Sequence, residues 1–404
     1  MSRVVPFRAI RAANALAAQV IAPPYDVMSE AEARAIVAGN PKSFVRVSRP
    51  ESVMPAGADS HAPEAYATAR AQFQAMLAEG ALVQDDTPSY YLYGQTWQGR
   101  TQVGLVAGFS VDEYDQDLIK KHEFTRPDKE KDRVDHIDAT DCQTGMVFLA
   151  YRDQEALNAL IAKGSQGAPE WEVTTEDAVT HRLWRISDAA TVAAITDAAG
   201  ELPCAYVADG HHRSAAASIV HRQRAGQSGN HAWFLAGLFP ASNLRILAYN
   251  RAVKDLHGHT EASLLASIAA HFDITDTDAP VPPGRGCVTM YLGGTWRLLT
   301  SRDVPSDPVA GLDVSILQDR VLRPLLGIDN PRTDKRIDFI GGIRGHEELV
   351  RLVDSGSHAV AFHMHPTSLG ELFDVADSGN VMPPKSTWFE PKLRDAVAMH
   401  PIGG

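Results

Sequence analysis

Hydrophobic and polar residues follow two different periods along this chain, and these periods separate its predicted strands from its predicted helices. The runs MVFLAY, HAWFLAGLF and AVAFHMHP are apolar and rich in branched or aromatic residues, which is typical of buried strands. Two further strand-like stretches, Tyr90–Thr96 and Gln102–Ser110, flank a turn at Gln98-Gly99-Arg100 and are predicted to pair. Helical spacing predicts an amphipathic helix over Ala62–Glu79. A further helix is predicted over Ser29–Ala38, where Ser29 and Glu32 form a capping-box pattern.

The order of these elements predicts an α+β protein with two parts. The segment Thr275–Gly286 is rich in Pro, Asp and Gly, which is typical of a connection between domains. We therefore expect a mixed-sheet core with insertions over residues 1–277 and a second α+β lobe over residues 278–404 that closes a cleft. Within the second part, CVTMYL and TWRLLT predict a hairpin across Gly293-Gly294.

Composition narrows the class of protein. The 404 residues are 44% hydrophobic and 22% charged, which is ordinary for a soluble globular protein. A net charge of -12 makes an extended nucleic-acid footprint unexpected. The three scattered cysteines predict reduced thiols in the cytoplasm, and no apolar run predicts a signal peptide or a membrane span. The oligomeric state has no signal in the sequence.

The segment YVADGHHRSAAASIV carries the clearest chemistry. It predicts a buried strand that stops at Asp209-Gly210 and continues directly as an Ala-rich helix. Asp209 stands where a helix N-cap is expected, and His211, His212 and Arg213 fall in the first turn. Basic side chains beside free backbone N–H groups predict a site for an anion, foremost phosphate. The alternative, a solvated helix start with chance histidines, leaves this clustering unexplained.

Two segments offer carboxylates that could serve such a site. Asp26 follows the stiff Pro-Pro-Tyr stretch of IAPPYDV, although an ordinary turn aspartate is equally compatible with it. The segment KKHEFTRPDKEKDR contains Glu123 and Arg126, in a loop that Pro127 is expected to keep from forming one helix. A carboxylate among cations can act as a base or bind metal, whereas a charge run can also be a solvated face.

Two later segments are weaker candidates. In AFHMHPT, His363 and His365 would point to one side of a strand, as half of a metal site or as polar lining of a cleft. In MPPKSTWFEPK, Lys385, Ser386 and Thr387 offer an ammonium and two hydroxyls without the glycines of a Walker loop. The alternative for this second segment is an ordinary C-terminal turn.

Taken together, VPFRAI, IAPPYDV, the His-Glu segment, ADGHHR, LDVSILQ and MPPKSTWFEPKL resemble the family catalogued as domain of unknown function 1015, over almost the whole chain. The Asp-Gly-His-His-Arg turn is in addition similar to that of free-serine kinases in the ParB/sulfiredoxin-like superfamily. The resemblance implies a ParB/sulfiredoxin-like core in which this turn binds nucleotide phosphates, a metal bridges them, and a glutamate acts as base toward serine.

The resemblance also implies roles for individual residues. Asp209 would face the metal or the acceptor hydroxyl, and Ser214 would cap the loop. The residues of the turn that would hold the phosphates are Gly210, His211, His212, Arg213 and Ser214. More distant residues would assist them, namely Arg126, Lys385, Ser386 and Thr387. The catalytic group would comprise Asp209, His212 and a base, with Glu123 as first choice and Asp26 or Glu30 as substitutes.

These expectations combine into one predicted activity with two alternatives. The first choice is a phosphotransferase of serine metabolism that moves a phosphoryl group from ATP or ADP to a small hydroxylated metabolite. The expected acceptor is free L-serine, and the expected cofactor is Mg²⁺. One alternative is a ParB-like nucleotide-binding switch without a small-molecule product. The other is a metal-dependent hydrolase or phosphatase that uses His211, His212, His363 and His365.

Overall fold

The computed structural model describes residues 3–403 and divides into two compact units. Unit 1 comprises the chain up to Leu244 together with the segment from Pro391 onward, and unit 2 comprises Arg245–Glu390. The expected boundary after residue 277 instead falls inside unit 2, between two strands of one sheet. Unit 1 therefore contains both the Asp-Gly-His-His-Arg turn and the last residues of the chain.

Unit 1 is built on a nine-stranded mixed sheet with the order β6-β11-β8-β12-β5-β4-β10-β9, in which β1 also pairs with β5. Two of its pairs, β11 with β6 and β12 with β8, are parallel and the others are antiparallel. The strands are β1 (Val4–Val5), β4 (Tyr90–Trp97), β5 (Arg100–Ser110), β6 (Ile119–Lys120), β8 (Val147–Tyr151), β9 (Trp171–Thr174), β10 (Thr180–Ile186), β11 (Ala205–Asp209) and β12 (Trp233–Pro240).

The turn predicted between β4 and β5 is confirmed, because the two strands pair antiparallel from Tyr91 opposite Val106 to Trp97 opposite Arg100. Two small sheets complete the unit: β2 (Ile10–Ala12) with β3 (Leu82–Gln84), and β7 (Cys142–Gln143) with β21 (His400–Pro401). Pairing of β21 with β7 ties the returning C-terminal segment to the rest of unit 1.

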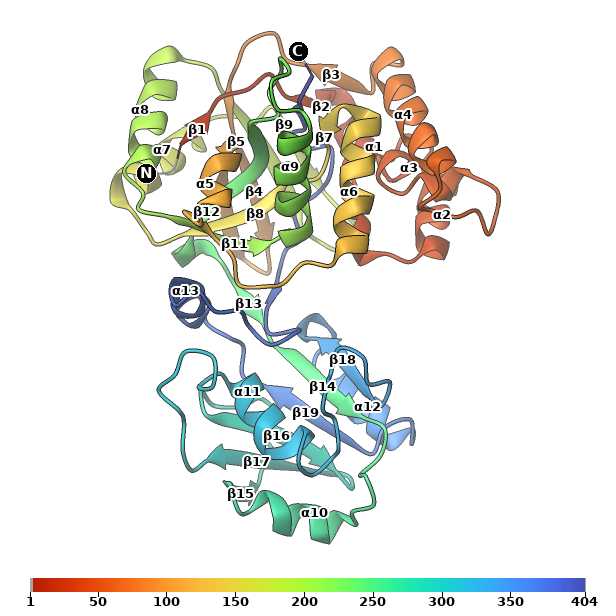
Figure 1. The fold of residues 1–404 in the computed structure, drawn as a ribbon, viewed down its shortest axis with the longest axis vertical. Coiled ribbons are helices and arrows are strands. Elements are labelled where there is room, and N and C mark those ends of the chain that lie inside the picture. Colours follow the sequence, from red (N-terminus) through yellow and green to blue (C-terminus); the bar gives the residue numbers. More distant parts are fainter. Residues whose placement is uncertain (1–2, 404) are drawn as a thin grey trace. The chain divides into compact units, whose positions relative to one another are not determined.

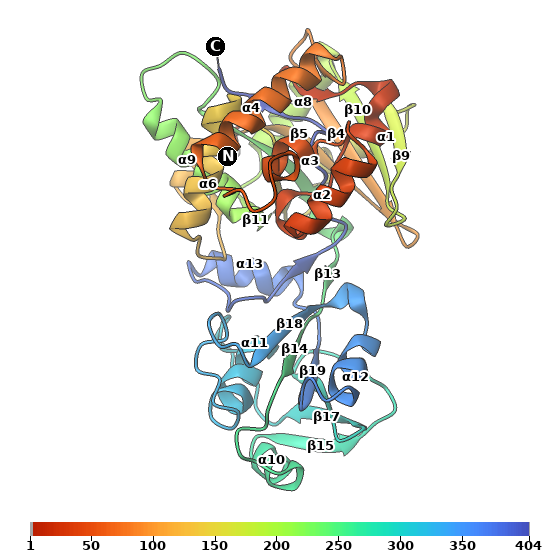
Figure 2. The same cartoon turned by 90° about the vertical axis from the view of Figure 1, so that its right-hand side faces the viewer.

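The helices of unit 1 pack partly on the nine-stranded sheet and partly on one another. They are α1 (Ala17–Val20), α2 (Glu30–Gly39), α3 (Val45–Ser48), α4 (Pro63–Ala78), α5 (Val111–Asp115), α6 (Pro127–Thr140), α7 (Glu155–Gly164), α8 (Ala189–Gly200) and α9 (His211–Gln223). Leu157 of α7 and Ile195 of α8 join the main core over the sheet. Val134 and Ile137 of α6 pack with Val220 of α9, and these two helices lie side by side with α4 next to α6 (Figure 1, Figure 2).

Two helix starts show how local sequence sets these elements. Ser29 caps α2 and forms the predicted capping box with Glu32. Pro127 is the first residue of α6, a position that tolerates its missing N–H. The expectation of a loop over Lys120–Arg133 was therefore wrong in its second half, since proline here begins a helix instead of interrupting one.

Unit 2 holds a six-stranded antiparallel sheet with the order β15-β17-β16-β19-β14-β18. Its strands are β14 (Tyr249–Val253), β15 (Phe272–Asp276), β16 (Cys287–Leu292), β17 (Thr295–Ser301), β18 (Ile337–Gly341) and β19 (Val360–Met364), and β13 (Ile246–Leu247) pairs separately with β20 (Trp388–Phe389). The helices are α10 (Glu261–Ile268), α11 (Asp313–Leu317), α12 (Glu347–Asp354) and α13 (Leu369–Asp377). The predicted hairpin across Gly293-Gly294 is confirmed, with both glycines at positive φ.

The fold class predicted from the sequence is confirmed: the chain is α+β, with a large mixed sheet first and a second α+β unit after it. Within residues 3–403, none of the helices combines the length and the apolar character needed to cross a membrane.

Candidate functional site

The candidate site begins where β11 passes into α9. β11 ends at Asp209, α9 begins at His211, and Gly210 between them has φ 94°, a left-handed conformation that glycine adopts without strain. The expectation that Asp209 caps the helix was wrong: Gly210 is the N-cap residue, because Asp209 still pairs with Phe148 in the sheet. Ser214 is not a cap either, since its hydroxyl donates within the helix to the carbonyl of His211.

No side chain caps α9, so its first amides face outward without a protein acceptor. The first bonds of the helix run from the N–H groups of Arg213 and Ser214 to the carbonyl of Gly210. The N–H groups of His211 and His212 precede them and engage no acceptor within residues 3–403. Unsatisfied amides at a helix start carry partial positive charge and favour an anion.

Asp209 is held by a residue from the far end of the sequence. Its Oδ2 lies 2.9 Å from Lys392 Nζ, and its Oδ1 accepts a hydrogen bond from the N–H of Gly210 at 2.8 Å. Burial opposes ionisation here, but the Lys392 ammonium and the Arg213 guanidinium outweigh it and hold the pKa of Asp209 below its ordinary value. Asp209 is therefore a preorganised, ionised carboxylate next to the N-terminus of α9.

His211 stands between a buried histidine and an exposed glutamate. The backbone N–H of His122 donates to His211 Nε2 at 3.5 Å, and the two imidazole rings meet edge to face with centroids 4.5 Å apart. Because Nε2 accepts, the ring proton of neutral His211 is on Nδ1, which lies 3.9 Å from Glu123 Oε2. Burial lowers the pKa of His211 well below its ordinary value and that of His122 to about 4, so both rings are neutral at pH 7.

Arg213 joins the helix start to the Pro-Pro-Tyr segment. Its NH2 lies 3.3 Å from both carboxylate oxygens of Asp26, and its NH1 donates to the carbonyl of Met146 at 3.0 Å. Burial works against this cation, but Asp26 and Tyr25 more than compensate and keep the pKa of Arg213 above its ordinary value. Arg213 Nε is buried and has no hydrogen-bond partner. The structure thus brings Asp26 to the same helix start as Glu123.

His212 and Arg126 are in contact through the backbone of Arg126, whereas the sequence predicts a phosphate-binding role for its side chain. The backbone N–H of Arg126 donates to His212 Nε2 at 3.1 Å. The guanidinium of Arg126 is instead paired with Asp128 at 2.7 Å, at the exposed start of α6. Arg126 therefore positions His212 through its backbone, and its charge is engaged locally.

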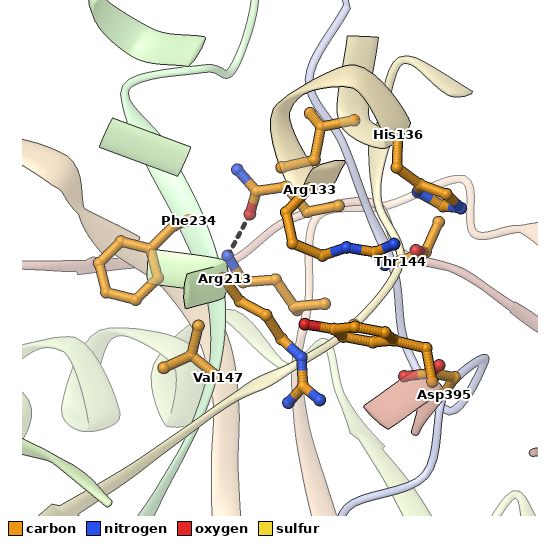
Figure 3. A pocket seen from close by; sticks show the side chains of 12 residues that line it. Arg133, His136, Thr144, Val147, Arg213, Phe234 and Asp395 are labelled. Carbon is orange, nitrogen blue, oxygen red and sulfur yellow. Dashed lines mark hydrogen bonds between the residues drawn. The ribbon is translucent and has the colours of Figure 1, made fainter. Parts of the chain in front are cut away.

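Next to Arg213 lies a pocket with an apolar and a polar side. Val147 and Phe234 line the apolar side, Arg133, His136, Thr144 and Asp395 line the polar side, and Arg213 stands between them (Figure 3). Asp395 is 3% exposed. Burial raises the pKa of its carboxyl to about 7, against the opposing effect of Arg213. Asp395 and Lys392 have no signal in the sequence, because residues 391–403 follow unit 2 in the chain and only the fold returns them to unit 1.

The remaining candidates belong to unit 2. Lys385 is exposed, has φ 58°, and its Nζ lies 5.4 Å from the ring centroid of Tyr249. The Ser386 hydroxyl donates to the carbonyl of Pro383 at 2.7 Å. Thr387 follows, half-buried, just before β20. The phosphate-binding role of these residues stays a prediction.

The histidine pair of unit 2 has only one member on the strand. His363 lies on β19, where its Nδ1 donates to the carbonyl of Pro280 at 2.8 Å, and His365 follows the end of the strand. Within residues 3–403 there is no group of three or more His, Cys, Asp or Glu side chains arranged to hold a metal ion.

Comparison with known proteins gives a family and several distant structural likenesses. No curated protein matches the chain. Solved structures that resemble it include C-terminally truncated SbnI from Staphylococcus aureus, with a TM-score of 0.40 and 13% identity over 72% of this chain and 85% of that one. A free serine kinase in complex with AMP has a TM-score of 0.34 and 10% identity over 71% of this chain and 86% of its own.

A conserved hypothetical protein from Pyrococcus furiosus has a TM-score of 0.35 and 12% identity, over 72% of this chain and 93% of that one. At TM-scores below 0.5 these likenesses carry no conclusion about activity. The family model described as "Protein of unknown function (DUF1015)" matches residues 4–315, which is more than half of the chain. The chain therefore belongs to the DUF1015 family.

Proposed function

We propose that the protein is a nucleotide-dependent phosphotransferase that moves a phosphoryl group from ATP or ADP to a small hydroxylated metabolite, with free L-serine as the first choice. The observation that carries this proposal is the uncapped start of α9, where two free amides stand beside Arg213 and two carboxylates. Phosphoryl transfer needs cations and N–H donors around the phosphates and a carboxylate near the nucleophile, and little else from the protein.

In this proposal the donor phosphates bind at the helix start. The N–H groups of His211 and His212 point outward, and Arg213 adds a permanent positive charge. Gly210 has no side chain, which allows a phosphate oxygen to approach the backbone closely. A nucleotide-bound free serine kinase is among the similar solved structures, and that likeness motivates the choice of donor without establishing it.

Glu123 is the proposed base. Its Oε2 lies 3.9 Å from Nδ1 of His211, so the carboxylate is beside the helix start where the phosphates would bind. In the reaction the acceptor oxygen forms a new bond to the terminal phosphorus while the bond from phosphorus to the bridging oxygen breaks. The hydroxyl proton passes to Glu123, and the shortened nucleotide leaves with the bonding electrons.

Mg²⁺ is the proposed cofactor, with Asp209 as its protein ligand. The Asp209 side chain is 35% exposed, and each of its oxygens accepts only one hydrogen bond from the protein, which leaves a lone pair on each. This fits an ion that takes most of its ligands from phosphate and water, as Mg²⁺ usually does. When bound, the ion would neutralise charge on the phosphates.

A donor-by-acceptor screen tests the proposal. ATP, ADP, CTP and pyrophosphate are each combined with L-serine and related alcohols in the presence of Mg²⁺, and products are followed by phosphorus NMR. We expect a new phosphomonoester signal with ATP or ADP and at least one amino-acid alcohol. Nucleotide binding without any phosphomonoester, across the whole screen, would contradict the transferase and favour the nucleotide-binding switch.

A further inference from the structure

The carboxylate of Asp395 is buried without a partner. It lies in the pocket beside Arg213, and no hydrogen bond or ion pair within residues 3–403 engages its oxygens. A buried carboxylate without a partner is costly to keep ionised, so protein interiors normally supply a donor or a cation for it. Asp395 is open to the pocket, which lets a ligand supply that group.

The surrounding arginines do not supply it, because each is already paired with another carboxylate. Arg213 faces Asp26, Arg133 donates to Asp132 with its NH2 at 2.7 Å, and Arg394 is paired with Asp177. Each of the three arginines is thus paired with another carboxylate, and Asp395 is left without a cationic partner. The pocket is therefore complementary to a ligand group that is positive and donates hydrogen bonds.

A metal ion is a poor candidate for that group. The arginines around Asp395 would repel a divalent ion more strongly than a single positive charge. A primary ammonium, with one charge and three N–H donors, satisfies a single carboxylate directly.

We propose that the pocket lined by Asp395, Arg133 and Arg213 is the acceptor subsite, in which Asp395 binds the primary ammonium group of an amino-acid or amino-alcohol acceptor. The pocket adjoins the phosphate site because Arg213 belongs to both (Figure 3). This inference rests on the proposed phosphotransferase and names the class of its acceptor: the hydroxyl that receives the phosphoryl group is carried by a molecule with an ammonium group.

The site can be tested by binding measurements that do not depend on turnover. L-serine, ethanolamine and D-glycerate share a hydroxyl, but ethanolamine lacks the carboxylate and D-glycerate lacks the ammonium. Isothermal titration calorimetry of each, with and without AMP, compares wild type with Asp395→Asn. Asp86→Asn is the matched control, since Asp86 is an 87% exposed carboxylate of unit 1.

We expect Asp395→Asn to weaken the binding of L-serine and ethanolamine by about 10- to 100-fold, the effect of losing one charge-assisted hydrogen bond. The affinity for D-glycerate, which has no ammonium group, should change by less than about twofold. Equal weakening of all three probes, which a general base or a structural role would give, overturns the inference. So does a wild type that binds AMP but none of the ammonium probes. A wild type that binds ammonium probes but no nucleotide refutes the phosphotransferase and leaves the subsite standing.

A second variant covers the case in which Asp395→Asn does not fold. A Cβ added at Gly145 would lie 3.3 Å from Arg213 Nε and 3.4 Å from Asp395 Oδ1, so Gly145→Ala narrows the pocket without removing a charge. We expect this substitution to weaken the binding of all three probes. Unchanged L-serine binding in a folded Gly145→Ala variant would overturn the inference.

Discussion

The start of α9 in unit 1 and the surroundings of Arg251 in unit 2 satisfy their polar groups in different ways. At the start of α9 in unit 1, charged side chains meet across long stretches of sequence, as in the pair of Asp209 with Lys392. In unit 2 the comparable groups bind backbone carbonyls close to them in the fold: Arg251 donates to Tyr249 and Lys385, and Ser386 donates to Pro383. Neutral carbonyl partners fix a loop, whereas paired and unpaired charges around a pocket create a field that a ligand can use.

This difference teaches where function should be sought. In unit 1 the helix start keeps two free amides, and the adjacent pocket holds the buried carboxylate of Asp395. In unit 2, burial without a carboxylate partner lowers the pKa of Arg251 to about 9, and its donors are used by carbonyl groups. We therefore assign ligand chemistry to unit 1 and a structural role to the Arg251 contacts.

Replacement of the proposed base, Glu123, should have the largest effect on turnover and is the strongest test of this assignment. Glu123→Gln keeps the shape of the side chain and removes its capacity to take a proton, so we expect turnover to fall by about 10³-fold, within the range for general-base removal. The measurement is the initial rate of phosphomonoester formation. Glu172→Gln is the control, because Glu172 is 53% exposed against 50% for Glu123 and is paired with Arg182 on the surface. Equal rates in both variants would remove Glu123 as the base.

Lys385→Met tests the contrast between the two units, because it shows whether unit 2 contributes a charge to the reaction. The substitution keeps the aliphatic stem and deletes the ammonium. We expect turnover and nucleotide affinity to stay at the wild-type level, because ligand chemistry is assigned to unit 1; a fall of about 10²-fold, the effect of losing one transition-state donor, would contradict that assignment. Lys254→Met is the control within unit 2, where Lys254 pairs with Asp338. Full activity in Lys385→Met would confine the site to unit 1.

Arg213→Ala tests the phosphate site itself. We expect nucleotide binding to weaken by about 1.5–3 kcal/mol, the contribution of a charge-assisted hydrogen bond. Since Arg213 also donates to the carbonyl of Met146, the free energy of unfolding should fall by about 1 kcal/mol. Calorimetric titration with ADP measures the first effect and urea denaturation the second. Arg222→Ala, on the last turn of the same helix, should change neither appreciably; a normal ADP affinity in Arg213→Ala would argue against the site.

The last prediction concerns the pH dependence of stability. Burial raises the pKa of Asp395 from its ordinary 3.8 to about 7, against Arg213, Arg133 and Arg394, which lower it, and with Asp26, which raises it. Between about pH 4 and 7 the folded chain keeps a proton that the unfolded chain releases, so this group's contribution to stability is lost as pH rises. Asp395→Asn should therefore gain stability relative to wild type over this window and level off above pH 7. A difference in melting temperature that stays constant from pH 4 to 8 would contradict the burial of an unpaired carboxyl.

The sequence predicted some local features of the site but not its long-range pairs. Gly210 at a strand-to-helix junction and the capping box at Ser29 depend on neighbouring residues, and both have the expected conformations. The pairing of Lys392 with Asp209 depends on the return of the chain to unit 1 after residue 390, which no periodicity encodes. The same return brings Asp395 into unit 1, and in the sequence alone it is one aspartate before an apolar stretch with no motif around it.

The most direct test of the central claim is to observe the helix start while nucleotide binds. Amide signals of the isotope-labelled protein are followed by transverse-relaxation-optimised NMR during titration with ADP and Mg²⁺. If the free amides of α9 hold phosphate, the N–H signals of His211 and His212 should show the largest shifts in unit 1, and Arg213→Ala should weaken the same titration. ADP binding that leaves these two signals in place would contradict the account.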